Sequence, residues 1–133
     1  MAFTKLISTC IPLPIDNIDT DQIIPARHLK KIVRTGLGVH AFEALREDPS
    51  FFANKSGFQE APILLAGPNF GCGSSREHAV WAIRDMGFRV VMAPSFADIF
   101  RNNCARFGVL TVELPRALWE QLMALASADE SGL

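Results

Sequence analysis

Short apolar runs alternate with amphipathic stretches in the second half of the chain. Three runs have the length of strands, and the first two are expected to be buried: Pro62 to Ala66, Arg89 to Ala93 and Val109 to Leu114. Helical periodicity covers the stretches between and after them: Arg76 to Met86, Ser95 to Phe107 and Leu118 to Ala126. Gly87 and Gly108 close the first two helices, and Ser95 is expected to cap the second. This alternation predicts an α/β fold with parallel β-α-β units, in which helices flank a mostly parallel sheet.

The first sixty residues are irregular and rich in turns. Within them we expect a short helix from Asp21 to Lys31, with Pro25 in its first turn, where a missing N–H costs little. A second short helix is expected from Val39 to Arg46, with Phe42 and Leu45 on one side. The length of 133 residues predicts a single domain, 1–133.

Charge and cysteine content exclude several classes of protein. A net charge of −1 gives no electrostatic reason to bind nucleic acid or an anionic membrane. No apolar run is long enough for a membrane span, and the start lacks the apolar run of a signal peptide. The three cysteines have no spacing typical of a disulfide framework, a zinc site or an iron–sulfur site, so no metal is expected on this chain. A reducing cytoplasm is the expected location.

The loop that follows the first apolar run carries the strongest chemical signal. In an open α/β sheet, ligands bind beyond the carboxyl ends of the strands, where this loop lies. Gly71 and Gly73 allow positive φ and close backbone approach, and Ser74 with Glu77 forms a capping box at a helix start. The N–H groups and dipole of that helix start, with the guanidinium of Arg76, predict a site for a small carboxylate.

Other uses of this loop are less well supported by its sequence. The loop lacks the third glycine of a dinucleotide fingerprint and the Gly-Lys pair of a P-loop. It also lacks the G-x-S-x-G elbow of a hydrolase. A capping box by itself is usually only a helix start, and this alternative stays open. Ser74 becomes a proton acceptor only where positive dipoles stabilise its alkoxide and water is excluded.

Four segments resemble motifs of a known family. Asn69 to Ala79 resembles the swivel-domain signature of the aconitase superfamily, and Ala93 to Phe100 resembles the motif that follows it. Asn17 to Ala26 and Arg34 to Gly36 are similar to the opening of bacterial 3-isopropylmalate dehydratase small subunits. The motifs occur in the family's order and cover nearly the whole chain.

The resemblance implies an aconitase-type swivelling domain that is half of a hydro-lyase. In this family a small subunit joins a large subunit, as a heterodimer or heterotetramer, and the large subunit carries a [4Fe–4S] cluster on its own cysteines. Together they interconvert 2-isopropylmalate and 3-isopropylmalate through isopropylmaleate in leucine biosynthesis. No cofactor is therefore expected on this chain, and its small-molecule partner is a dicarboxylate.

The resemblance also implies roles for individual residues. Ser74 corresponds to the serine that removes the carbon-bound proton, and Ser75 and Arg76 to residues that bind the substrate carboxylate. Arg46 corresponds to a second carboxylate-binding arginine. The remaining matched positions are near the site or structural: Thr20, Asp21, Gly71 and Gly73.

Departures from the family pattern leave the substrate's side chain open. His28, Leu37 and Leu45 replace residues that are aromatic or otherwise different in the bacterial subunits. The alternatives are the small subunit of a homoaconitase-type or dimethylmalate-type hydro-lyase, and a carboxylate-binding module without catalysis. The chain also stops sooner than the small subunits of this family. Cys72 is interpreted as a small loop residue and Cys104 as a core residue.

Overall fold

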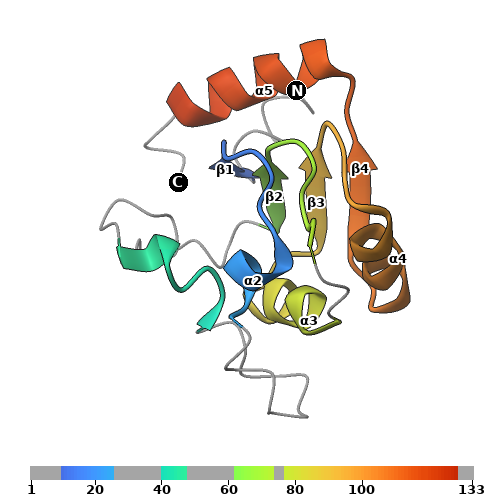
Figure 1. The fold of residues 1–133 in the computed structure, drawn as a ribbon. Helices are drawn as coiled ribbons and strands as arrows, with labels where there is room; N and C mark the ends of the chain where they lie inside the picture. The colour runs from blue at the N-terminus through green and yellow to red at the C-terminus, as the bar shows by residue number, and fades with distance from the viewer. Residues whose placement is uncertain (1–9, 26–39, 48–61, 74–76, 129–133) are drawn as a thin grey trace.

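The computed structural model describes residues 10–25, 40–47, 62–73 and 77–128, and contains one parallel sheet (Figure 1). Its strands are β1 Cys10–Leu13, β2 Ile63–Ala66, β3 Val90–Ala93 and β4 Leu110–Glu113. Its helices are α2 Thr20–Ile23, the 3-10 helix η3 Leu45–Glu47, α3 Glu77–Asp85, α4 Asp98–Arg106 and α5 Arg116–Ala128. The four strands lie in the order β1-β2-β3-β4, and each pairs in parallel with the next. The predicted α/β fold is confirmed.

Helices cover both faces of the sheet, which explains the continuous apolar runs of the inner strands. Leu64 and Val91 belong to the larger core, which includes side chains of α2, α3 and α4. Leu65 and Met92 point the other way and belong to a second core under α5. Figure 1 shows α5 on the opposite side of the sheet from α2, α3 and α4. The alternation of side chains along each strand thus assigns successive residues to different cores.

The strand β1 was not predicted. The sequence around it was expected to be irregular, because Pro12 lies in the middle of the run Cys10–Leu13. Among the described residues, β1 is the first strand of the sheet order, and β2 is the only strand that pairs with it. A proline without an N–H is tolerated on such an edge strand, where one side makes no ladder bonds. The proline therefore indicated an edge strand rather than the absence of a strand.

The two helices expected in the first half are shorter or different. In place of a helix from Asp21 to Lys31, α2 ends at Ile23, and Ile24 is extended with φ −145° and ψ 115°. Pro25 explains this early end, because a residue before proline is forced out of the helical region. The rest of that predicted helix lies outside the described residues.

The helix expected from Val39 to Arg46 is a turn followed by η3. Phe42 has φ +55°, which interrupts any regular helix, and its ring is completely buried. The predicted apolar side is nevertheless present, since Leu45 packs against the same core. Burial of Phe42 was predicted by the pattern, whereas its backbone conformation was not.

The three helices of the second half lie where the periodicity predicted them. Gly87 and Gly108 follow α3 and α4 with φ of +106° and +79°, as expected for residues just past a helix end. Ser95 is not the cap of α4: the cap position is Ala97, without a side-chain bond. The Ser95 hydroxyl instead accepts a hydrogen bond from the N–H of Asn69 at 2.8 Å. Within the described residues, no helix is both long and apolar enough to cross a membrane.

Candidate active site

We call the loop after β2, Gly67 to Gly73, the glycine loop. It lies alongside the loop after β1, and hydrogen bonds between the two loops continue the pairing of the strands. The N–H of Gly71 donates to the carbonyl of Ile18 at 2.8 Å, and the N–H of Thr20 donates to the carbonyl of Cys72 at 2.8 Å. Asp19 and Cys72 form an isolated parallel bridge. In Figure 1 the segments before α2 and after β2 run side by side. The loop is therefore anchored along one side by main-chain bonds.

The loop after β3 anchors the other side of the glycine loop. The N–H of Phe70 donates to the carbonyl of Ser95 at 3.3 Å, and the N–H of Ala97 donates to the carbonyl of Phe70 at 3.1 Å. Phe70 and Phe96 form a second parallel bridge. The order β1-β2-β3 is thus preserved in the loops at the carboxyl edge of the sheet, where ligands bind in folds of this kind.

Both glycines of the loop have conformations that favour glycine. Gly71 has φ +81° and Gly73 has φ +95°. A Cβ on Gly71 would lie 2.6 Å from the Cβ of Phe100 and would also clash with its ring. A Cβ on Gly73 would lie 3.3 Å from the Cβ of Asp19 and 3.6 Å from the Thr20 hydroxyl. Glycine is required at 71 by both packing and φ, and at 73 chiefly by φ.

Thr20 and Asp21, which the sequence predicted to be near the site or structural, lie in different surroundings. Thr20 is buried, and its N–H bonds to the carbonyl of Cys72, so it lies directly beside the glycine loop. Asp21 is exposed on α2. The cap of this helix is Asp19, whose carboxylate accepts from the N–H of Gln22 at 2.7 Å, while Gln22 Oε1 accepts from the N–H of Asp19 at 3.0 Å. This reciprocal pair fixes the start of α2 beside Cys72.

Arg46 lies on η3, in a segment attached to α2. The N–H of Phe42 donates to the carbonyl of Ile23 at 2.8 Å, which places residues 40–47 beside α2. The Nε of Arg46 donates to the carbonyl of Ala41 at 2.6 Å. Burial lowers the pKa of this guanidinium, and the charge of Glu43 opposes that effect. One donor of Arg46 is therefore used to hold its own segment.

The three residues with the most direct predicted roles, Ser74, Ser75 and Arg76, lie outside the described residues. The structure describes the positions on both sides of them. Before them is Gly73, and after them Glu77 begins α3 and pairs with Arg106 of α4 at 3.2 Å. The centre of the His78 ring lies 4.5 Å from that of Trp81, and the two ring planes are tilted by 50°, so His78 packs against this tryptophan.

The three thiols are too dispersed to form one metal site. Cys10 and Cys104 are buried in different cores on opposite faces of the sheet. The Sγ of Cys72 donates to the carbonyl of Asn17 at 3.5 Å, and burial followed by the charge of Asp19 raises the pKa of this thiol. Raised pKa values oppose the thiolate form that iron or zinc requires. An iron–sulfur cluster does not fit these donors. More generally, no group of three or more His, Cys, Asp or Glu side chains in the described part of the chain could hold a metal ion.

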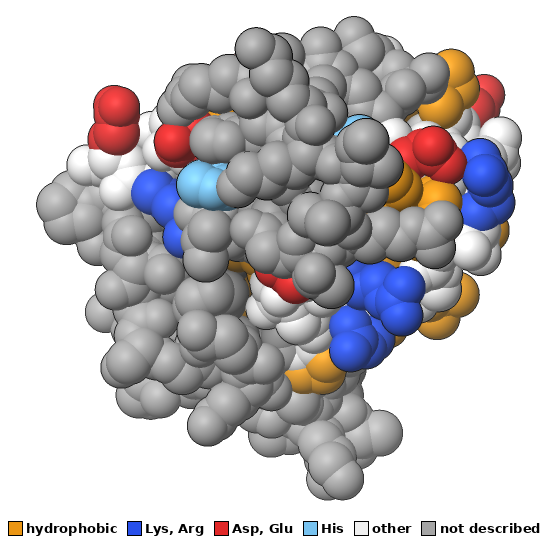
Figure 2. Space-filling view, turned by 90° about the horizontal axis from the view of Figure 1, so that it is seen from below, with side chains coloured by type: hydrophobic (Ala, Val, Ile, Leu, Met, Phe, Trp, Pro, Cys, Tyr) orange, Lys and Arg blue, Asp and Glu red, His pale blue; other side chains and the backbone are white. Residues whose placement is uncertain are grey.

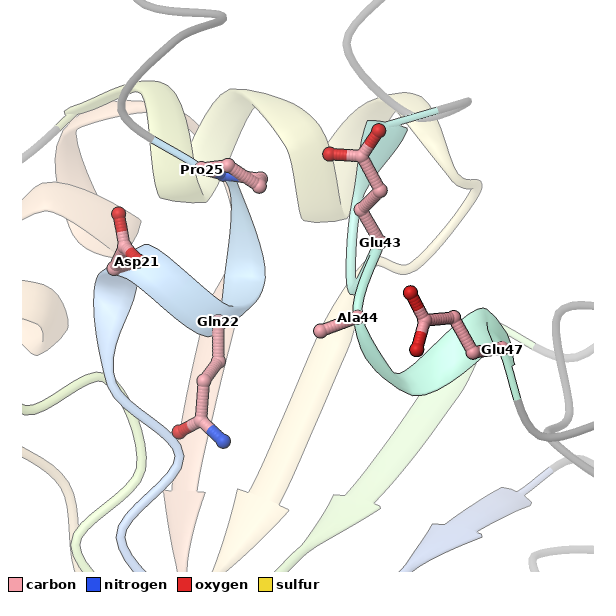
Figure 3. Close-up of a pocket in the computed structure, with 6 residues that line it drawn as sticks. All are labelled: Asp21, Gln22, Pro25, Glu43, Ala44 and Glu47. Carbon is pink, nitrogen blue, oxygen red and sulfur yellow. The ribbon is translucent and has the colours of Figure 1, made fainter.

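A hollow of about 260 Å³ lies between α2 and the segment of η3 (Figure 3). Its lining is acidic or neutral: Asp21, Gln22, Pro25, Glu43, Ala44 and Glu47. Carboxylates repel an anionic ligand, so the hollow does not suit the predicted dicarboxylate. Figure 2 shows acidic and basic side chains interspersed among the described residues of the α2 and α3 side, in agreement with the small net charge.

Comparison with known proteins identifies relatives over most of the chain. The chain is 54% identical over 125 residues to a protein of Rubrobacter xylanophilus named 3-isopropylmalate dehydratase small subunit, covering 94% of this chain and 64% of that one. A protein of Rhodospirillum centenum with the same name is 55% identical over 130 residues, covering 93% and 64%. The chain thus spans about two thirds of the length of these relatives, at 64%.

A solved structure and a domain family agree with these relatives. The crystal structure of a 3-isopropylmalate dehydratase (LeuD) from Methanocaldococcus jannaschii superposes with a TM-score of 0.66 and 38% identity, covering 77% of this chain and 58% of that one. The segment 1–117 matches the aconitase C-terminal domain. The parallel sheet, the glycine loop at its carboxyl edge and this match over most of the sequence lead to one conclusion: the chain belongs to the aconitase C-terminal domain family.

Proposed function

We propose that this chain is the small subunit of a 3-isopropylmalate dehydratase. The observation that carries the proposal is the glycine loop, which main-chain bonds anchor on both sides at the carboxyl edge of the sheet and which leads directly into Ser74. The names of relatives at 54% and 55% identity supply one substrate, 3-isopropylmalate. The resemblance of the sequence to the family implies 2-isopropylmalate as the other. The active enzyme joins this chain to a large subunit, in the cytoplasm, where free thiols such as these persist.

The reaction we propose begins with proton removal by Ser74. The C–H proton of the substrate passes to the Ser74 alkoxide, and the electron pair of that bond forms the double bond of isopropylmaleate as hydroxide leaves the neighbouring carbon. The proton and the hydroxide are together released as one water, and loss of the proton restores the Ser74 alkoxide. Ser75 and Arg76 hold a substrate carboxylate, and Arg46 holds the other; a guanidinium grips a carboxylate through two hydrogen bonds. A [4Fe–4S] cluster on the large subunit supplies Lewis-acid chemistry when bound.

The first prediction concerns Ser74→Ala in the complex of the chain with its large subunit. Turnover of 3-isopropylmalate should fall at least about 100-fold, because a positioned base contributes on the order of 10²- to 10⁴-fold. The measurement is the rate of isopropylmaleate formation, followed with size-exclusion chromatography to confirm that the complex still forms. Cys72→Ser is the matched control, because a serine hydroxyl can still donate to the carbonyl of Asn17. Unchanged turnover in Ser74→Ala would remove this serine from the role of base.

The same assay separates the alternatives. Faster turnover of homoaconitate or a dimethylmalate would replace the proposed substrate but keep the reaction. Tight dicarboxylate binding by the chain, with no turnover after the large subunit and its cluster are added, would favour a carboxylate-binding module.

A further inference from the structure

Two asparagines join the loop after β1 to the glycine loop through their side chains. The Nδ2 of Asn69 donates to the Oδ1 of Asn17 at 3.1 Å. Neither residue was identified from the sequence as part of a site. We call this pair the asparagine clasp.

Both members of the clasp have left-handed backbone conformations. Asn17 has φ +56° and Asn69 has φ +58°. Such values cost energy for residues with a Cβ, and asparagine is among the side chains that adopt them most readily. The backbone N–H groups of both asparagines are also bonded: that of Asn17 donates to the carbonyl of Pro68 at 2.9 Å, and that of Asn69 donates to the Ser95 hydroxyl at 2.8 Å.

The clasp lies where both aligned segments begin. Asn17 immediately precedes the residues that bond to Gly71 and Cys72, and Asn69 immediately precedes Phe70. A rotation at Asn69 would therefore displace the whole stretch Phe70–Gly73, and with it the chain that continues into Ser74. Ser95 fixes Asn69 from the other side, so three loops meet at this point.

Exposure argues that the clasp contributes little to global stability. Both asparagines are exposed, and their side chains belong to neither core. A hydrogen bond open to water adds little net stability, because water replaces it on unfolding. Its main effect is to select one backbone arrangement of the loop.

We infer that Asn17 and Asn69 are positioning residues for the reaction, which set the place of the glycine loop and hence of the serine that follows it. This inference rests on the proposed function. It does not make either asparagine a catalytic residue, since each acts through the backbone of the loop.

Aspartate substitutions test the clasp with little change of shape. Aspartate also tolerates a left-handed backbone. In Asn17→Asp and in Asn69→Asp, the asparagine that remains can still donate through its Nδ2 to the new carboxylate. The double variant places two carboxylates opposite each other, and no hydrogen bond can form between two ionised acceptors. The two single variants therefore serve as matched controls for the added charge.

We expect a non-additive loss of kcat in the complex with the large subunit at pH 8 and saturating substrate. Each single variant should keep kcat within about 3-fold of the parent, whereas the double variant should lose at least about 10-fold beyond the product of the single effects, since small misplacements of reacting groups reduce rates strongly. The thermal unfolding midpoint of the double variant should stay close to that of the parent, because the clasp contributes little to global stability. A double variant whose effect equals the product of the single effects would overturn the inference.

A second measurement keeps the inference separate from the proposed function. The backbone amide signals of Gly71 and Gly73 in the ¹⁵N-labelled chain should shift in the double variant and stay close to the parent in both single variants. Absent turnover by the parent complex would refute the proposed function alone. Unshifted glycine signals in the double variant would refute the clasp, whatever the activity.

Discussion

At position 71, both the packing and the backbone conformation require glycine. Its φ of +81° lies in the left-handed region, and the ring of Phe100 occupies the space that a side chain would need. Phe100 is itself held by an edge-to-face contact with Phe70, with ring centres 5.3 Å apart. The glycine therefore lets the main chain of the site rest directly on an aromatic ring of α4.

Gly71→Ala should lower the free energy of unfolding by about 3 kcal/mol, because the added methyl group both overpacks the core and strains the backbone. Urea unfolding measures this change. Gly108→Ala is the matched control: its φ is +79°, but nothing lies within 4 Å of the added Cβ, so only about 1 kcal/mol of backbone strain is expected. Equal losses in the two variants would contradict the role assigned to Phe100.

At the scale of elements, a buried hydrogen bond joins α5 to the sheet, in addition to the apolar contacts of the second core. The indole Nε1 of Trp119 donates to the carbonyl of Ala66 at 2.8 Å, at the end of β2. The guanidinium of Arg116 lies 5.1 Å from the centre of the same ring. The buried bond fixes α5 on the face opposite to α3 and α4.

Trp119→Phe should destabilise the chain by about 2 kcal/mol, because the carbonyl of Ala66 loses its indole partner and the smaller ring leaves space. Leu125→Ala is the control on the same helix. Leu125 is 50% exposed, so its loss should cost no more than about 0.5 kcal/mol. Thermal or urea unfolding of both variants provides the comparison, and equal stabilities would argue against the Trp119 bond as the anchor of α5.

The elements also show what the sequence could predict. The apolar runs and the glycines after the helices predicted β2, β3, β4 and their helices. Burial leaves a strong local pattern in β2 and β3, whereas β4 is exposed at Leu110 and Glu113 and half-buried between them. The local sequence pattern could not predict β1, because the pairing of β1 with β2 involves residues more than fifty positions apart. Ser95 looked like a helix cap, but its hydroxyl bonds to Asn69 in another loop. Local patterns predicted a site at the glycine loop, whereas the contacts that position this loop are long-range.

At the scale of the whole molecule, the two cores each contain a thiol that folding keeps protonated. Burial raises the pKa of Cys10 to about 11 and that of Cys104 to about 12, from 9.0 for a free thiol. In the unfolded chain these thiols ionise at lower pH. The folded state is therefore fully stabilised below pH 9 and loses this stabilisation as pH rises toward the folded pKa values.

The free energy of unfolding should thus fall between about pH 9 and pH 11, by at most about 1.4 kcal/mol per pH unit for each buried thiol. The chain has no tyrosine to titrate in the same range. Cys104→Ser should flatten this slope, measured by urea unfolding under reducing conditions. Cys72→Ser, at a partly exposed thiol, should change it less. Identical slopes in all three proteins would contradict the prediction.

The contact of α5 with β1 has a consequence for synthesis on the ribosome. The face of the sheet that carries Cys10, Leu65 and Met92 is covered by residues of α5, the last helix described. The strands emerge first, so among the described residues the helix that covers this apolar face is missing until residues 116–128 have left the exit tunnel. A nascent chain arrested just before that point presents an apolar surface to chaperones. The opposite core comes entirely from residues synthesised earlier, the last of them Val109.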